Sequence, residues 1–70
     1  MENLKFNLKC AIDDFFLASK AVREAENRFN CASPEYFDIA NIELSIAKMQ
    51  QRATFKRVQA LQKEIKRIRQ

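Results

Sequence analysis

The sequence has no glycine, no histidine and no tryptophan, and it has a single proline among 70 residues. Glycine and proline supply many of the tight turns in proteins, so a chain that almost lacks both has few places to reverse direction. An all-β fold needs many turns and is therefore excluded. The composition favours long helices.

Long apolar runs are also missing. The longest spans residues 15–18, far short of the roughly 20 residues that a transmembrane helix needs. The start, Met1-Glu2-Asn3, lacks the basic and apolar stretches of a signal peptide. Because 47% of the residues are hydrophobic, the chain is too apolar for a disordered protein. We expect a cytoplasmic protein that does not associate with a membrane.

Only two cysteines are present, Cys10 and Cys31. On one helix they would lie about 30 Å apart, too far for a disulfide within the chain. Two thiols without histidine also do not complete a four-ligand zinc site. We therefore expect free thiols in a reducing cell, with an intermolecular disulfide as the alternative.

A single break divides the chain, at residues 30–35. Asn30 suits the left-handed conformation that ends helices, Ser33 suits an N-cap, and Pro34 with Glu35 suits a first helical turn. The sequence predicts one domain over residues 1–70. Its elements are a helix at about 3–30, a loop at 31–33 and a helix at about 34–68.

Each predicted helix carries apolar residues at alternating spacings of three and four, which is a heptad pattern. In both helices a large position alternates with a small one, and alanine dominates the small position. The first seam is Leu4, Leu8, Ala11, Phe15, Ala18, Val22, Ala25 and Phe29; the second is Phe37, Ala40, Leu44, Ala47, Gln51, Thr54, Val58, Leu61, Ile65 and Ile68.

The short loop requires antiparallel helices, so the fold class is an all-α, coiled-coil-like two-helix hairpin with an alanine-rich seam. We expect Ala25 to face Ala40 and Phe29 to face Phe37. In this register helix 1 runs out near residue 3. Residues 63–70 are then expected to project beyond it, leaving Ile65 and Ile68 uncovered.

A second apolar stripe lies on the other side of helix 2, and helix 1 adds apolar residues outside its seam. The candidate interface residues are Ile39, Ile42, Ile46, Met49, Ala53, Phe16 and Leu17. One hairpin does not bury two opposite faces, and exposed apolar patches of this size mark interfaces. We expect a homodimer that forms a four-helix bundle. A foreign protein partner and scattered surface residues are the alternatives.

No arrangement typical of catalysis is present. Asp13 and Asp14 are adjacent on a helix and point about 100° apart, and there is no glycine-rich loop or Cys-x-x-Cys motif. We expect no enzyme, no cofactor and no metal. Gln51, the polar residue of the paired seam, has two interpretations: a marker of register, or the edge of the core where its amide reaches solvent or backbone.

The charge is uneven along the chain. Residues 1–47 hold 5 basic and 8 acidic side chains, whereas residues 48–70 hold 8 basic residues and only Glu64. Such a segment suits phosphates, an acidic protein or a membrane surface, or it is simply solvated. The candidate contacts are Lys56, Arg57, Lys63, Lys66, Arg67 and Arg69.

Residues 25–29, Ala-Glu-Asn-Arg-Phe, followed by residues 33–40, Ser-Pro-Glu-Tyr-Phe-Asp-Ile-Ala, resemble the YaaL-like family of small Firmicute proteins. That family carries Asp-Pro-Asp-Leu-Ile-Asp-x-Ala after a first amphipathic helix. The resemblance covers about residues 20–52 and implies a helical hairpin of bacterial or phage origin; the family's function is unknown, so it implies no active site. Pro34, Glu35, Asp38, Ala40 and Ala47 fit the pattern, while Ser33 and Tyr36-Phe37 depart from it.

Two functions follow as hypotheses. The first is a small non-catalytic protein that self-associates and binds another protein through an apolar helix face, as a bacterial or phage regulator or inhibitor does. The alternative is a nucleic-acid-binding protein that uses the basic segment 48–70.

Overall fold

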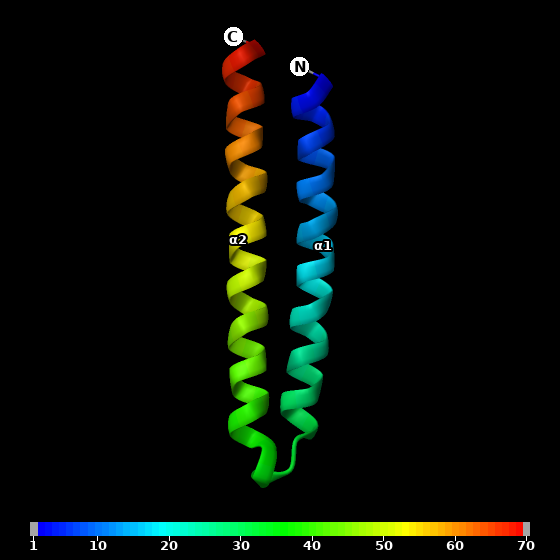
Figure 1. Cartoon of the computed structure of the whole chain (residues 1–70), viewed down its shortest axis with the longest axis vertical. Helices are drawn as coiled ribbons and strands as arrows, with labels where there is room; N and C mark the ends of the chain where they lie inside the picture. Colours follow the sequence, from blue (N-terminus) through cyan, green and yellow to red (C-terminus); the bar gives the residue numbers. More distant parts are fainter. Residues whose placement is uncertain (1, 70) are drawn as a thin grey trace.

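The computed structural model describes residues 2–69 as two long helices that lie antiparallel and side by side (Figure 1). Helix α1 spans Glu2–Cys31 and helix α2 spans Phe37–Arg69. A short 3₁₀ helix, η1, spans Pro34–Tyr36 and leads directly into α2. The molecule measures 54 × 14 × 12 Å. The predicted all-α antiparallel hairpin is confirmed.

The chain reverses direction without any left-handed residue, since no residue between 2 and 69 has a positive φ. The expected left-handed end of the first helix at Asn30 is therefore wrong, and Asn30 lies inside α1. Instead, the backbone N–H of Ala32 donates to the carbonyl oxygen of Phe29 at 3.3 Å. Ser33 is then extended, with φ −71° and ψ 159°, and takes the N-cap position although its hydroxyl makes no capping hydrogen bond.

Small side chains dominate the contact between the two helices. Alanine on facing helices lets their axes approach closely, at the short end of the usual 8–10 Å. At the loop end, the rings of Phe29 and Phe37 meet edge to face with centroids 4.5 Å apart, which confirms this predicted pair. The buried residues are Ala11, Val22, Ala25, Ala40, Ala47, Val58 and Ile65.

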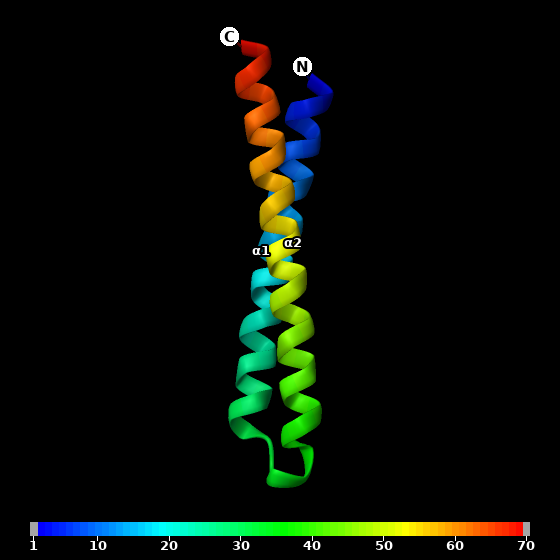
Figure 2. The same ribbon diagram turned by 90° about the vertical axis from the view of Figure 1, so that its left-hand side faces the viewer.

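Two ion pairs show that one register continues along the hairpin. Arg28 Nε lies 3.3 Å from Glu43 Oε2, and Arg57 Nη1 lies 3.6 Å from Asp14 Oδ2. The two paired residues of α1 are 14 residues apart, and so are the two of α2, which is two heptads on each helix. The helices therefore keep one register between the two ion pairs. Figure 2 shows α2 passing in front of α1 at mid-length, as expected for helices that wrap around each other.

The open end of the hairpin differs from the expectation. Ile65 is only 8% exposed, so the prediction that α1 leaves it uncovered is wrong. Side chains of a helix tilt toward its N-terminus. The side chain of Ile65 therefore tilts toward the loop, while side chains at the start of α1, such as Leu4, tilt toward the open end. The two tilts bring Ile65 level with the start of α1, which counting residues from the loop does not show. Ile68 is 49% exposed, and Gln70 lies outside the described residues.

Candidate protein-interaction surface

Five apolar residues of α2 lie outside its contact with α1, and the last of them, Ala53, borders a groove between the two helices. At 3.6 residues per turn, their mean direction is about 150° from that of the seam residues. Ile39 and Ile46 each directly precede a buried alanine of the seam, Ala40 and Ala47. The four large members are 46–60% exposed, and the fifth is also exposed. This surface, the outer stripe, consists of Ile39, Ile42, Ile46, Met49 and Ala53.

Leu17 of α1 adjoins the outer stripe through a shallow groove between the helices. Leu17 is 66% exposed and lines this groove together with Ala53. Small residues such as Ala18 and Ala21 line this groove, and its lining is largely apolar. Its full lining is Asp14, Leu17, Ala18, Ala21, Gln50, Ala53 and Thr54.

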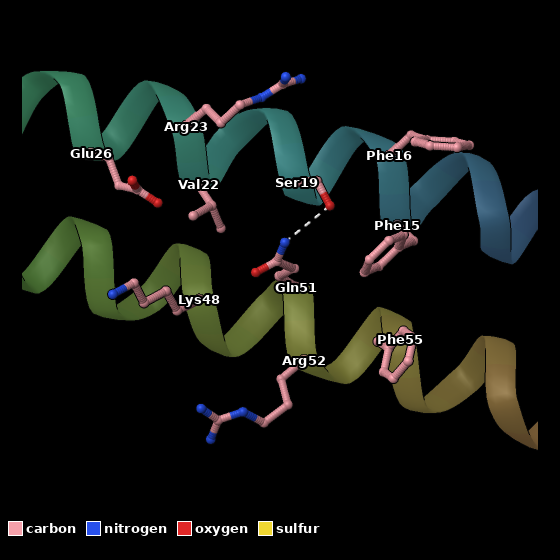
Figure 3. Close-up of a pocket in the computed structure, with 10 residues that line it drawn as sticks. All are labelled: Phe15, Phe16, Ser19, Val22, Arg23, Glu26, Lys48, Gln51, Arg52 and Phe55. Atoms are coloured by element: carbon pink, nitrogen blue, oxygen red, sulfur yellow. Dashed lines mark hydrogen bonds between the residues drawn. The ribbon is translucent and has the colours of Figure 1, made fainter.

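Phe16 does not join the outer stripe, although it neighbours Leu17 in the sequence. It lines a different groove, of about 770 Å³, that shares no residue with the first (Figure 3). The floor there is aromatic, with the rings of Phe15 and Phe55 5.5 Å apart. Charged side chains from both helices form the rim, as Figure 3 shows: Arg23, Glu26, Lys48 and Arg52.

The same groove contains a polar link that neither interpretation of Gln51 anticipates. Gln51 Nε2 donates to Ser19 Oγ at 3.1 Å, so its amide meets a side chain of α1 (Figure 3). The Thr54 hydroxyl, Oγ1, in turn donates to the backbone carbonyl oxygen of Gln51 at 2.8 Å. Sequence reasoning also missed Phe55 as an apolar surface residue; its position, four residues after Gln51 and three before Val58, borders the seam and was a usable signal.

The six candidate basic contacts all lie along the second half of α2 and are exposed. Two of them have acidic partners: Arg57 pairs with Asp14, and Arg67 pairs with Glu64 one turn earlier. Among the side chains of residues 3–69, which are the ones the structure describes, the other four make no ion pair: Lys56, Lys63, Lys66 and Arg69.

Cys10 is partly buried, Cys31 is exposed, and both thiols are free. Over the described part of the chain, no cluster of cysteine, aspartate and glutamate is arranged to hold a metal ion. Neither α1 nor α2, as far as the structure describes them, is apolar over a length that would cross a bilayer.

No protein-family model, curated protein or solved structure matches this chain. The resemblance to the YaaL-like family stays a prediction.

Proposed function

We propose that this hairpin is a non-catalytic module that self-associates and binds proteins through its exposed apolar surface. The observation that carries the proposal is the accessible surface of the single chain, 5677 Å² for 8.2 kDa. A compact monomer of this mass exposes about 4,500 Å². The excess, about 1,100 Å², is larger than the roughly 800 Å² that each partner covers in a standard interface.

The shape explains this excess. The radius of gyration is 16.0 Å, whereas a compact domain of this length has about 11 Å. Two helices side by side enclose little volume, and among residues 3–69 no large side chain is completely buried. The isoleucines of the outer stripe are about half exposed, so burying the rest of one such side chain stabilises an assembly by about 1 kcal/mol. Association through several of them adds to the small core of the hairpin.

A homodimer is the simplest such assembly, because two hairpins supply the four helices of a bundle. In this proposal the partner packs against α2 on the side away from α1. A protein of this size suits a regulator or inhibitor that occludes another protein's surface. The cytoplasm, where thiols remain reduced, suits the two free cysteines.

The test replaces Ile42, which is 59% exposed, with aspartate. The hairpin loses no core contact, so circular dichroism should show a folded helix. In sedimentation equilibrium, Ile42→Asp should shift the protein from dimer toward monomer. The matched control, Asn27→Asp, adds the same charge to the outer side of α1 and should leave the mass unchanged. Equal masses for both variants and the parent would contradict the proposal.

The unpaired cations of α2 support a second candidate function, nucleic-acid binding. Four of the six candidate basic residues have no acidic partner among the described side chains of residues 3–69, and cations of this kind suit phosphates. The test is fluorescence anisotropy with a DNA duplex over a range of salt concentrations. Affinity that falls steeply with salt, and falls less steeply for Lys63→Gln/Lys66→Gln, supports this function; no binding at low salt contradicts it.

A further inference from the structure

We propose that two copies of this chain dock antiparallel through their outer stripes, related by a two-fold axis that passes beside Ile46. This inference rests on the proposed self-association and specifies its geometry. It names the occupant of the stripe as a second copy of α2.

The spacing of the outer stripe permits this arrangement. Ile46 is its central member, with Ile42 and Met49 one turn away on either side and Ile39 and Ala53 two turns away. An antiparallel second copy therefore brings Ile46 against its own equivalent. It also brings Ile42 against the second copy's Met49, and Ile39 against the second copy's Ala53. Every large side chain of the stripe is then covered.

The charges at the two ends of the stripe select the antiparallel orientation. Glu35 lies in η1, four residues before Ile39 at the loop end of the outer stripe, and Lys56 lies in α2 three residues after Ala53 at the other end. Both are exposed. The two-fold axis beside Ile46 places Glu35 opposite the second copy's Lys56, twice per dimer. A parallel arrangement would instead place Glu35 against Glu35 and Lys56 against Lys56.

The charges on either side of Ile46 also favour the antiparallel orientation. Residues 35–43 contain three carboxylates and no cation, and one of these carboxylates, Glu43, already pairs with Arg28 of α1. Residues 48–57 contain four cations and no carboxylate, and one of these cations, Arg57, already pairs with Asp14 of α1. Antiparallel docking lays each acidic segment along the basic segment of the other copy. Parallel docking would align segments of like charge.

A second copy also fits the available surface. The outer side of α2 runs free along its whole length, opposite α1 (Figure 1). Docking α2 on α2 is isologous, so the assembly closes as a dimer and does not propagate into a filament. The excess surface of the single chain is enough for one interface of standard size.

Cysteine cross-linking tests the geometry. In a Cys10→Ala/Cys31→Ser background, Ile46→Cys places one thiol beside the two-fold axis, within reach of its equivalent, and should give a covalent dimer on mild oxidation. Ile39→Cys is the matched control. Its two copies would lie 14 residues apart along the helix, about 21 Å, which is too far for a disulfide. Mixing Ile39→Cys with Ala53→Cys should restore cross-linking.

Sedimentation of the cysteine-free parent separates the outcomes. A dimer in which Ile46→Cys cross-links and Ile39→Cys does not is the expected result. A dimer in which both single variants cross-link is parallel, and one in which neither the single variants nor the mixture cross-link uses another surface. Both overturn this inference and leave the proposed self-association intact. A monomeric parent overturns both.

Charge reversal provides a second, non-covalent test. Lys56→Glu places Glu35 opposite a glutamate at both ends of the dimer and should raise the dissociation constant about tenfold. The double variant Glu35→Lys/Lys56→Glu restores unlike pairs and should return the dissociation constant to within about twofold of the parent. Equal weakening in the single and double variants would overturn the antiparallel register.

Discussion

The two faces of α2 have opposite compositions. The inner face, against α1, is built around Ala40 and Ala47, while the outer face carries Ile39, Ile42, Ile46 and Met49. In most globular proteins the large apolar side chains are inside. In the first half of α2 the buried residues are alanines, which let two helices approach closely, while four large apolar side chains lie on the exposed face. Large side chains are buried only in the second half of α2, at Val58 and Ile65. This difference is the reason for proposing that the hairpin associates through the outer face of α2.

Overpacking the inner face should produce the largest loss of stability. Ala47→Leu inserts a bulky side chain between closely spaced helices and should lower the free energy of unfolding by up to about 3 kcal/mol. Ala60→Leu, at an exposed position of the same helix, is the control and should change it little. Thermal and urea melts at one protein concentration measure both variants. An unfolding free energy of Ala47→Leu equal to that of the parent would mean that the inner face accommodates a leucine without strain.

At the open end, Ile65 and Ile68 distinguish covered from uncovered positions of one seam. Ile65→Ala removes a buried side chain and should cost about 2 kcal/mol of unfolding free energy. Ile68→Ala should cost under about 0.5 kcal/mol, because half of that side chain is already exposed. Urea denaturation measures the loss of unfolding free energy in each variant. Equal losses would contradict this prediction, because they would mean that both residues project beyond α1.

The hydrogen bond between Gln51 and Ser19 should contribute less. A double-mutant cycle with Gln51→Leu, Ser19→Ala and the combined variant isolates it, and a coupling of about 1 kcal/mol is expected. A coupling near zero would show that the amide is solvated and that the two helices are held by packing alone at this level.

The ion pair between Arg28 and Glu43 should have the smallest effect. Both side chains are about half exposed, so solvent screens their attraction. Arg28→Ala should lower the unfolding free energy by less than about 0.5 kcal/mol, and moderate salt should remove the difference. A larger or salt-independent loss would indicate that Arg28 contributes by packing against the loop end.

Heptad spacing was sufficient to predict the hairpin and the pair Phe29–Phe37, because periodicity and loop length determine which faces meet. The burial of Ile65 could not be obtained in this way, since it depends on the tilt of side chains along each helix. The contacts of Gln51 with Ser19 and of Phe15 with Phe55 depend on rotamers, which spacing does not specify.

For the interaction surface, the sequence correctly identified the outer stripe as a row that one hairpin leaves exposed. It did not separate Phe16 from Leu17. Neighbouring residues of a helix point about 100° apart, so these two side chains enter grooves on opposite sides of the helix pair.

The central claim is that the outer face of α2 is covered in the working protein. Sedimentation equilibrium of the unmodified chain under reducing conditions, over a range of micromolar concentrations, tests it most directly. The account predicts a reversible association toward twice the 8.2 kDa mass of the chain, which Ile42→Asp abolishes. A folded monomer at every concentration, unchanged by that substitution, would contradict it.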